Sequence, residues 1–153
     1  MTGNGTDQTQ DRLTLRSRLS DMAQLPTWIE GLASRYAIPD DAQFAMNLCL
    51  EEVVSNVIRH GYGPEADRPV TVRFTTPREG YCVIVVEDEA PRFNPLDAPE
   101  LPALGPGEEF RVGGQGIRLL RRFAETLEYE PTANGNRLRM GFSTAGSAAR
   151  TRS

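Results

Sequence analysis

The chain has 153 residues, enough for one domain with a real hydrophobic core. Its 17 basic and 21 acidic side chains argue against a nucleic-acid groove and against binding to an anionic membrane surface. We find no apolar run of membrane-spanning length and no basic-then-apolar signal peptide at the start. Cys49 and Cys82 lie in expected core elements and outside any metal-ligand cluster, so a reduced, cytoplasmic compartment fits best.

The chain begins and ends with small, polar residues. We expect disordered tails at 1–10 and 144–153, with a single folded domain over 11–143. Leucines alternate with arginines over 12–19, which predicts a half-buried strand. Apolar residues then recur at helical spacing over 21–37, which predicts a helix.

The stretch 44–63, FAMNLCLEEVVSNVIRHGYG, predicts a central helix with one buried face, beginning after Pro39-Asp40-Asp41. Glu52, Asn56 and His60 fall on one line at i, i+4 and i+8, at the edge of the apolar face. A carboxylate, an amide and an imidazole are costly to bury beside a core unless they have a use. The alternative is a solvated polar border, and for His60 also a core histidine.

Two strands are expected next, one over 70–74 and one over 81–86 that ends at Glu87-Asp88, with a turn at 77–80. The second strand is almost continuously apolar, which predicts burial on both faces and a central place in the sheet. A short helix over 117–123, a strand over 126–130, an Asn134-Gly135 turn and a strand over 137–142 follow. We expect an α/β (α+β) two-layer sandwich, a mixed sheet covered on one face by about three helices.

The loose stretch 91–116 separates these parts and contains five prolines between Pro91 and Pro106. A connection this long within a domain is usually functional or disordered. It ends in Gly113, Gly114 and Gly116 directly before a helix, where backbone amides can approach a phosphate. Asp88 stands where a buried strand ends, so its carboxylate can meet a ligand. Taken alone, the glycines fit a flexible loop and the aspartate fits a surface turn.

Together, the motifs resemble those of the Bergerat-fold ATPases, which include gyrase, heat-shock chaperones and histidine kinases. More narrowly, EEVVSNVIRHGYG, EDEAPRFNP and GGQGIRLLRRF are similar to motifs of the bacterial anti-sigma factor serine/threonine kinases. The resemblance covers about residues 11–143. It implies that Asn56 coordinates Mg²⁺ bridging the ATP phosphates and that Glu52 is the general base.

The resemblance also assigns the rest of the pocket. Asp88 would accept the adenine amine, and His60 and Gly61 would line the phosphate side. The lid would be the proline- and glycine-rich stretch, mainly 95–112, and the phosphate cradle would be formed by Gly113, Gly114 and Gly116. The sequence departs from the family at Ala90 and Arg92, where glycines are usual or frequent. Alanine restricts the backbone near the base, so this departure bears on nucleotide affinity and not on the fold.

Two functions follow from the resemblance. The first is an ATP- and Mg²⁺-dependent kinase that phosphorylates a STAS-domain anti-anti-sigma protein and sequesters a sigma factor or similar target. The second is a non-catalytic binding module that holds and releases a partner, with or without nucleotide. In both, homodimer formation stays open, and neither nucleic acid nor a membrane is an expected partner. A histidine kinase module is disfavoured because His60, the one histidine, lies inside the ATP motif and no helical dimerisation segment precedes the domain.

Overall fold

Five strands and three α-helices make up the computed structural model, which describes residues 9–63, 66–97 and 115–145. The strands are β1 (Asp11–Arg16), β2 (Pro69–Arg78), β3 (Tyr81–Asp88), β4 (Thr126–Pro131) and β5 (Asn136–Ser143). The helices are α1 (Gln24–Tyr36), α2 (Asp40–Asn56) and α3 (Gln115–Phe123). Short 3-10 helices η2 (Leu19–Ala23) and η4 (Pro95–Asp97) and a π-helix η3 (Val57–Tyr62) complete them. Each expected strand and helix is present.

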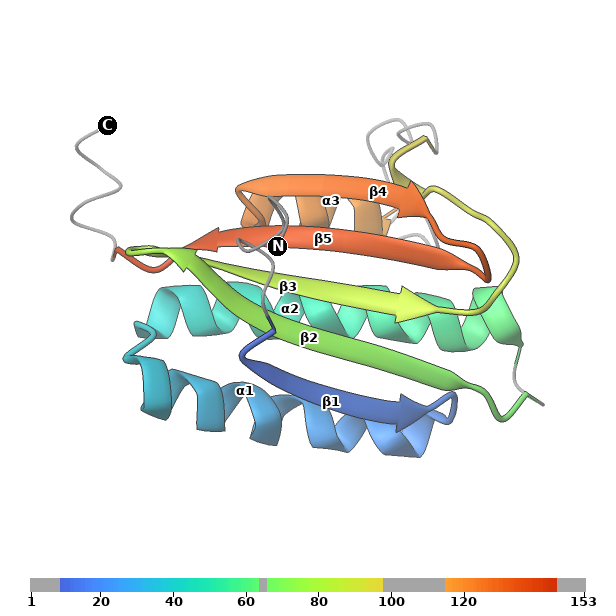
Figure 1. Ribbon diagram of the computed structural model, residues 1–153, viewed down its shortest axis with the longest axis horizontal. Coiled ribbons are helices and arrows are strands. Elements are labelled where there is room, and N and C mark those ends of the chain that lie inside the picture. Colours follow the sequence, from blue (N-terminus) through green and yellow to red (C-terminus); the bar gives the residue numbers. More distant parts are fainter. Residues whose placement is uncertain (1–8, 64–65, 98–114, 146–153) are drawn as a thin grey trace, which may run out of the picture.

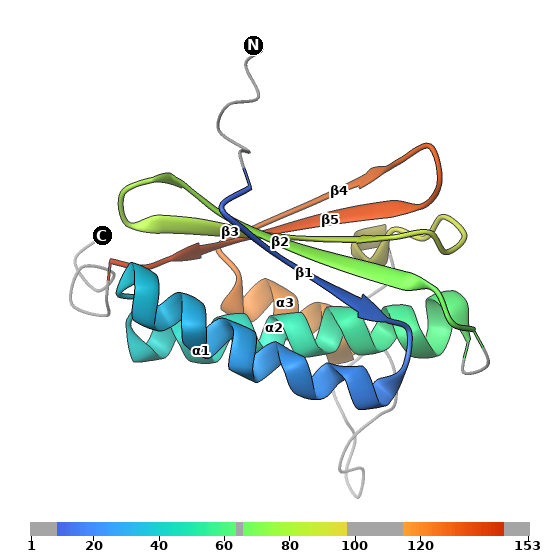
Figure 2. The same cartoon turned by 60° about the horizontal axis from the view of Figure 1, so that its bottom comes forward.

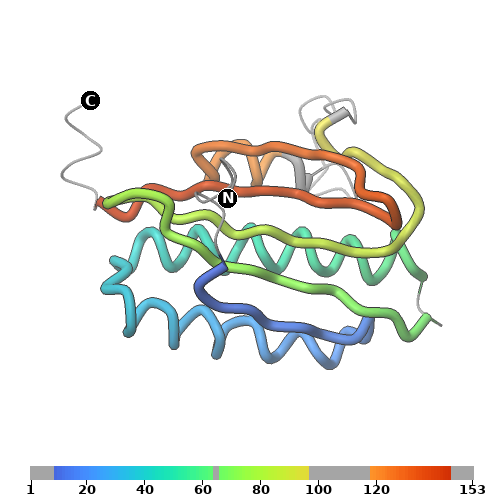
Figure 3. The backbone as a smooth tube through the Cα atoms, in the orientation of Figure 1, coloured from blue at the N-terminus to red at the C-terminus, as the bar shows by residue number. Residues whose placement is uncertain are grey.

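The strands form one sheet in the order β1-β2-β3-β5-β4, with all three α-helices on one of its faces (Figures 1 and 2). This arrangement confirms the expected two-layer sandwich. The sheet differs from the expectation in one respect: all four strand pairs are antiparallel, so it is not mixed. The β2–β3 and β4–β5 hairpins can be followed in the tube of Figure 3.

The path of the chain explains the antiparallel pairing. Two helices lie between β1 and β2, so the chain returns to the end where β1 finished and β2 runs back along it. A single helix, α3, separates β3 from β4, and these two strands do run in the same direction. They are not neighbours, however, because β5 lies between them and is antiparallel to both.

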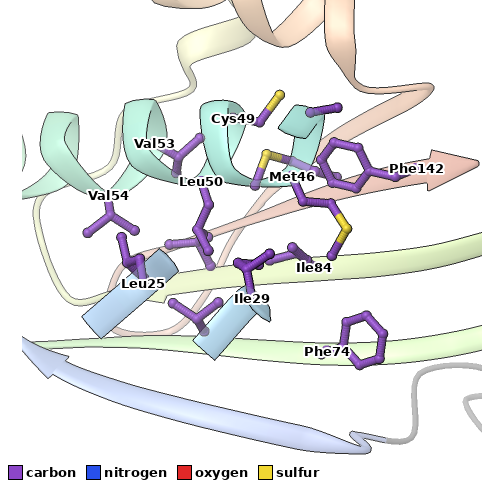
Figure 4. Close-up of a cluster of buried hydrophobic side chains, with 14 of the residues drawn as sticks. Leu25, Ile29, Met46, Cys49, Leu50, Val53, Val54, Phe74, Ile84 and Phe142 are labelled. Carbon is purple, nitrogen blue, oxygen red and sulfur yellow. The ribbon is translucent and has the colours of Figure 1, made fainter. Parts of the chain in front are cut away.

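The core lies between the sheet and the buried face of α2 (Figure 4). Met46, Leu50 and Val54 are fully buried on this helix, as its apolar spacing predicts. They pack among residues of α1 and of the central strands: Leu25, Ile29, Leu32, Phe74, Ile84, Met140 and Phe142. Burying a large apolar side chain of this kind stabilises the fold by about 1.5–3 kcal/mol, so α2 is held firmly on the sheet.

The two cysteines are core residues. Both side chains are fully buried, and burial raises the pKa of Cys49 and of Cys82 to about 12. The Cys82 thiol lies 3.9 Å from the Met46 sulfur, on the facing helix. Because the thiolate is the reactive form of cysteine, both thiols are chemically inert at neutral pH.

The central strand β3 is buried on both faces, as expected. Cys82, Ile84 and Val86 face the helices, whereas Val85 points to the opposite face and is still only 4% exposed. Its direct neighbours across the sheet are Arg73 and Arg139. Long arginine side chains can cover apolar surface with their methylene stems, so no second helical layer is needed over Val85.

Glu87, the next residue of β3 on this face, holds two of the arginines. Its Oε2 accepts from Arg73 Nη2 at 2.8 Å and from Arg137 Nε at 2.5 Å. Arg137 in turn contacts Glu130 on the edge strand β4. The ion pairs therefore cross four neighbouring strands, from β2 to β4.

The β4–β5 hairpin packs against the end of β3. Its turn, residues 132–135, contains the expected Asn134-Gly135 pair and is closed by a hydrogen bond from Thr132 N to Gly135 O of 2.9 Å. A Cβ atom on Gly135 would lie 2.0 Å from the carbonyl oxygen of Asp88 and 2.6 Å from Cα of Glu89. Glycine is required at 135 because the backbones of the hairpin turn and of the end of β3 are in contact and leave no room for a side chain.

Several expectations concern residues outside the described ranges. These include nearly all of the two terminal tails, most of the proposed lid, and Gly113 and Gly114 of the phosphate cradle. The boundaries of the tails and of the domain therefore stay predictions. Among the residues that the structure describes, no helix is both long enough and apolar enough to cross a membrane.

We predict opposite effects of adding a methyl group at two glycines. Gly135→Ala should lower the free energy of unfolding by about 3 kcal/mol, because the new methyl meets backbone that has no room to yield. Gly31→Ala should raise it by about 0.5–1 kcal/mol, because Gly31 lies within α1, where an added Cβ meets nothing within 4 Å. Urea unfolding measures both changes. Equal stability of the two variants would show that the hairpin is not in close backbone contact with the end of β3.

Candidate functional site

A cavity of about 470 Å³ opens between the end of the long helix and the sheet. One wall is formed by the last turn of α2 and by η3, and the other by the end of β3 and the start of β5. Six of the residues singled out from the sequence line it: Asn56, His60, Gly61, Asp88, Ala90 and Arg92. The fold therefore brings the helical motif and the motif after β3 to a single site.

The polar side chains of α2 are joined by a hydrogen bond. Asn56 Nδ2 donates to Glu52 Oε2 at 3.1 Å, which the i, i+4 spacing on a helix makes possible. Asn56 is exposed at the cavity and Glu52 is half-buried beside it, although Glu52 does not itself line the cavity. Because the amide nitrogen is engaged with Glu52, the amide oxygen of Asn56 is left for another partner. Glu51 is exposed.

The helix changes its winding directly after Asn56. In the π-helix η3 the bond from Gly63 N to Ile58 O, of 3.2 Å, spans five residues. Such wider turns are rare in proteins, and those that occur are often found at functional sites. Here Ile58 stays in the core while His60 and Gly61 lie along the cavity. His60 is exposed, so it is not a core histidine.

Gly61 and Ala90 meet across the cavity. A Cβ atom on Gly61 would lie 3.1 Å from the Cβ of Ala90, so the methyl group of Ala90 occupies the space that a larger residue 61 would need. Ala90 is 4% exposed, and its φ lies outside the left-handed region that favours glycine. The alanine is therefore accommodated without backbone strain at the position where the resemblance leads one to expect glycine.

Asp88, the last residue of β3, is 8% exposed. Its Oδ1 accepts from the Ala90 backbone N–H and from Asn136 Nδ2, each at 2.9 Å. Burial raises the pKa of the Asp88 carboxyl, and these two hydrogen bonds oppose the shift because they favour the ionised form. Both bonds end on Oδ1, so Oδ2 is the oxygen left to a ligand in the cavity.

Two residues that the sequence analysis did not single out hold the segment after β3. Asn136, at the start of β5, bonds to Asp88 and to the backbone that follows it. Tyr62 Oη donates to Pro69 O at 2.7 Å and accepts from Glu89 N at 2.6 Å. Asn136 did carry a signal, because it occupies the inward-facing position that continues the series Leu138, Met140 and Phe142.

The glycine-rich motif is described only in part. Gly116 lies in the first turn of α3, whereas Gly113 and Gly114 lie outside the described residues. Phe123, at the end of α3, packs edge-on against Phe44 near the start of α2, with 5.8 Å between ring centroids. The two helices therefore run in opposite directions, and α3 begins toward the cavity end of α2. The phosphate cradle itself stays a prediction.

The sequence is similar to known proteins. Residues 15–142 match the family described as "Histidine kinase-like ATPase domain". The chain is 27% identical over 114 residues to serine/threonine-protein kinase BtrW of Bordetella bronchiseptica, covering 72% of this chain and 78% of that protein.

The fold is similar to solved structures. One contains the RsbU and RsbW domains of a Mycobacterium tuberculosis protein, with a TM-score of 0.61 and 12% identity, covering 87% of this chain. The matched region is 31% of that longer chain, so the present chain spans about a third of its length. Another is the histidine kinase domain of a blue-light activated kinase of Erythrobacter litoralis, with a TM-score of 0.49 and 17% identity, covering 82% of this chain and 60% of that one.

The family match extends over most of the chain, from β1 into β5, and includes α2, η3 and the end of β3, which enclose the cavity. The expected fold relationship is thereby confirmed: this protein belongs to the histidine kinase-like ATPase domain family.

Proposed function

We propose that this chain is an ATP-dependent regulatory serine/threonine kinase. The observation that carries the proposal is the meeting of Asn56 and Asp88 at opposite walls of one cavity, with Glu52 bonded to Asn56. Membership of the ATPase domain family and the similarity to a protein named as a serine/threonine kinase support it.

Asp88 would recognise the base. Its Oδ1 already accepts two hydrogen bonds from the protein. Its Oδ2 would accept a hydrogen bond from the 6-amino group of adenine. Apolar side chains of α2, β3 and β5 complete the walls: Val53, Val86 and Leu138. A pocket with apolar walls and one oriented polar group is typical of a site for a flat, largely apolar ligand.

Asn56 would hold Mg²⁺. Mg²⁺ prefers oxygen ligands and commonly takes only one or two from the protein, completing its shell with phosphate oxygens and water. The residues fit this requirement, because the Asn56 amide nitrogen is bonded to Glu52 and its oxygen is free to act as a ligand. When bound, Mg²⁺ would offset the phosphate charge. His60, Gly61 and the glycines at 113, 114 and 116 would complete the phosphate side.

Glu52 would act as the general base toward the attacking hydroxyl. It lies one helical turn before Asn56 and is bonded to it, so its carboxylate stands next to the expected metal ligand. Phosphoryl transfer depends more on positioning and charge stabilisation than on covalent chemistry. A carboxylate beside the metal and a bound nucleotide would therefore suffice for transfer.

The acceptor that we propose is a serine or threonine of a STAS-domain anti-anti-sigma protein, with a sigma factor or similar target as the second partner. The similarity to a serine/threonine kinase and the shared fold with a structure containing an RsbW domain support this choice. A cytoplasmic location is part of the proposal, and homodimer formation stays open.

The alternative is a non-catalytic module that binds a partner with or without nucleotide. The observation that favours it is the position of Glu52 behind Asn56, outside the lining of the cavity. A site that only holds nucleotide would need Asp88 and Asn56 but not a base at 52. The two functions are separated by whether labelled phosphate from ATP reaches a STAS protein.

We predict that Asn56→Ala abolishes most Mg²⁺-dependent ATP binding, with a loss of at least tenfold in affinity, because the proposed metal ligand is removed. Calorimetry with ATP in the presence and absence of Mg²⁺ measures this. Asn47→Ala is the matched control, since Asn47 lies on the same helix and away from the cavity. Wild-type affinity in Asn56→Ala would remove the metal assignment.

Glu52→Gln should bind ATP normally and transfer phosphate about 10²–10⁴-fold more slowly, the usual cost of losing a general base. Glutamine keeps an oxygen that can accept from Asn56 Nδ2, so the orientation of Asn56 is retained while the base is lost. Glu51→Gln is the control and should be silent, because Glu51 is exposed and lies about 100° around the helix from Glu52. Transfer at the wild-type rate in Glu52→Gln would favour the binding module.

We predict that a substitution at Ala90 compensates for one at Gly61, because the two residues are in contact. Gly61→Ala should weaken ATP binding about tenfold, because two methyl groups at 3.1 Å push the segment after β3 away from η3. Adding Ala90→Gly to the same chain removes one of the methyl groups and should restore most of the affinity. Binding titrations of the two single variants and the double variant test this. An additive double variant would show that the two positions are independent.

A further inference from the structure

Asn136 makes an unusual number of hydrogen bonds for one side chain. It is 8% exposed, and its Nδ2 donates to Asp88 Oδ1 at 2.9 Å, Pro91 O at 3.1 Å and Ala90 O at 3.3 Å. Its Oδ1 accepts from Phe93 N at 2.9 Å and from Tyr129 Oη at 2.5 Å. One buried amide thus contacts four residues of the segment 88–93.

The orientation of this amide is fixed by its partners. The carboxylate of Asp88 and the two carbonyl groups can only accept, so they must face the nitrogen. The backbone N–H of Phe93 can only donate, so it must face the oxygen. An aspartate at 136 would have the same shape, yet it would place an oxygen against three acceptors.

We propose that Asn136 is a positioning residue that sets the specificity of the site for a 6-aminopurine. It does so by holding Oδ1 of Asp88, so that Oδ2 is presented to the amino group of the base. This inference rests on the proposed function, which requires Asp88 to bind adenine. Asn136 itself need not touch the nucleotide, since both ends of its amide are occupied by the protein.

The geometry favours this role over a purely structural one. Asp88 receives only two hydrogen bonds from the described residues, both on Oδ1, and one of them comes from Asn136. Without that donor, the Ala90 N–H alone would hold the carboxylate, which could then rotate about its last bond. Rotation would misdirect the oxygen that recognises adenine.

The test compares ATP with the triphosphate of purine riboside, which lacks the 6-amino group and is otherwise the same. Affinities are measured with Mg²⁺ for the wild-type chain and for Asn136→Asp, which keeps the size of the side chain and replaces the donor by an acceptor. Asn134→Asp is the matched control, because it makes the same chemical change at an exposed position of the same hairpin. Melting temperatures are recorded for all variants.

The wild-type chain should prefer ATP over the analogue by at least tenfold, and Asn134→Asp should keep this preference. Asn136→Asp should lose at least tenfold in ATP affinity while its affinity for the analogue changes less than threefold. An equal loss for both nucleotides, or no loss for either, would overturn the inference. If the wild-type chain binds neither nucleotide, the proposed function fails and the inference falls with it.

Asn136→Ser decides the question if the aspartate variant does not fold. Serine is one bond shorter than asparagine, so it weakens the contact with Asp88 without placing a second carboxylate beside it. We expect a reduced preference for ATP over the analogue, between that of the wild type and equal binding. A full wild-type preference in this variant, or an equal loss of both nucleotides, would contradict the role of the amide.

Discussion

The site depends on the attachment of the end of β3 to the start of β5. Backbone contact at Gly135 and the hydrogen bonds of Asn136 bring the two strands' ends together. The carboxylate of Asp88 is buried there, and a buried charge is tolerated only when hydrogen bonds compensate for lost water. Two donors on Oδ1 supply that compensation and also fix the direction of the group. The same bonds that permit the burial of Asp88 therefore orient it toward the cavity.

The opposite wall depends on the packing of α2 against the sheet. Because Leu50 and Val54 are locked in the core, the end of α2 cannot move away from β3 without exposing apolar surface. The wider turn that follows carries Gly61 to within van der Waals reach of Ala90. The width of the cavity is thus set by core packing at one end and by a glycine facing an alanine at the other.

Local patterns predicted most of this arrangement, and long-range pairing accounts for what they missed. The helix that carries Glu52 and Asn56 is predictable because its periodicity lies within one segment. The antiparallel sheet was missed because strand order depends on where β5 inserts, which no local pattern encodes. Asn136 was missed for the same reason, since it acts on residues more than forty positions earlier in the chain. Its inward position on a strand was visible in the sequence, but the carboxylate that it serves was not.

The hydrogen bond between Asn56 and Glu52 links nucleotide binding to phosphate transfer in the proposed reaction. An amide whose oxygen binds a cation becomes a stronger N–H donor, so a metal bound at Asn56 would strengthen the hydrogen bond from Asn56 to Glu52. Nucleotide and metal binding at Asn56 would therefore hold the Glu52 side chain in position for the transfer step. In a chain that only binds nucleotide, the same bond would serve to orient Asn56 and nothing more. The kinase and the binding module would thus share every residue around adenine. They differ in whether the Asn56–Glu52 pair takes part in phosphate transfer.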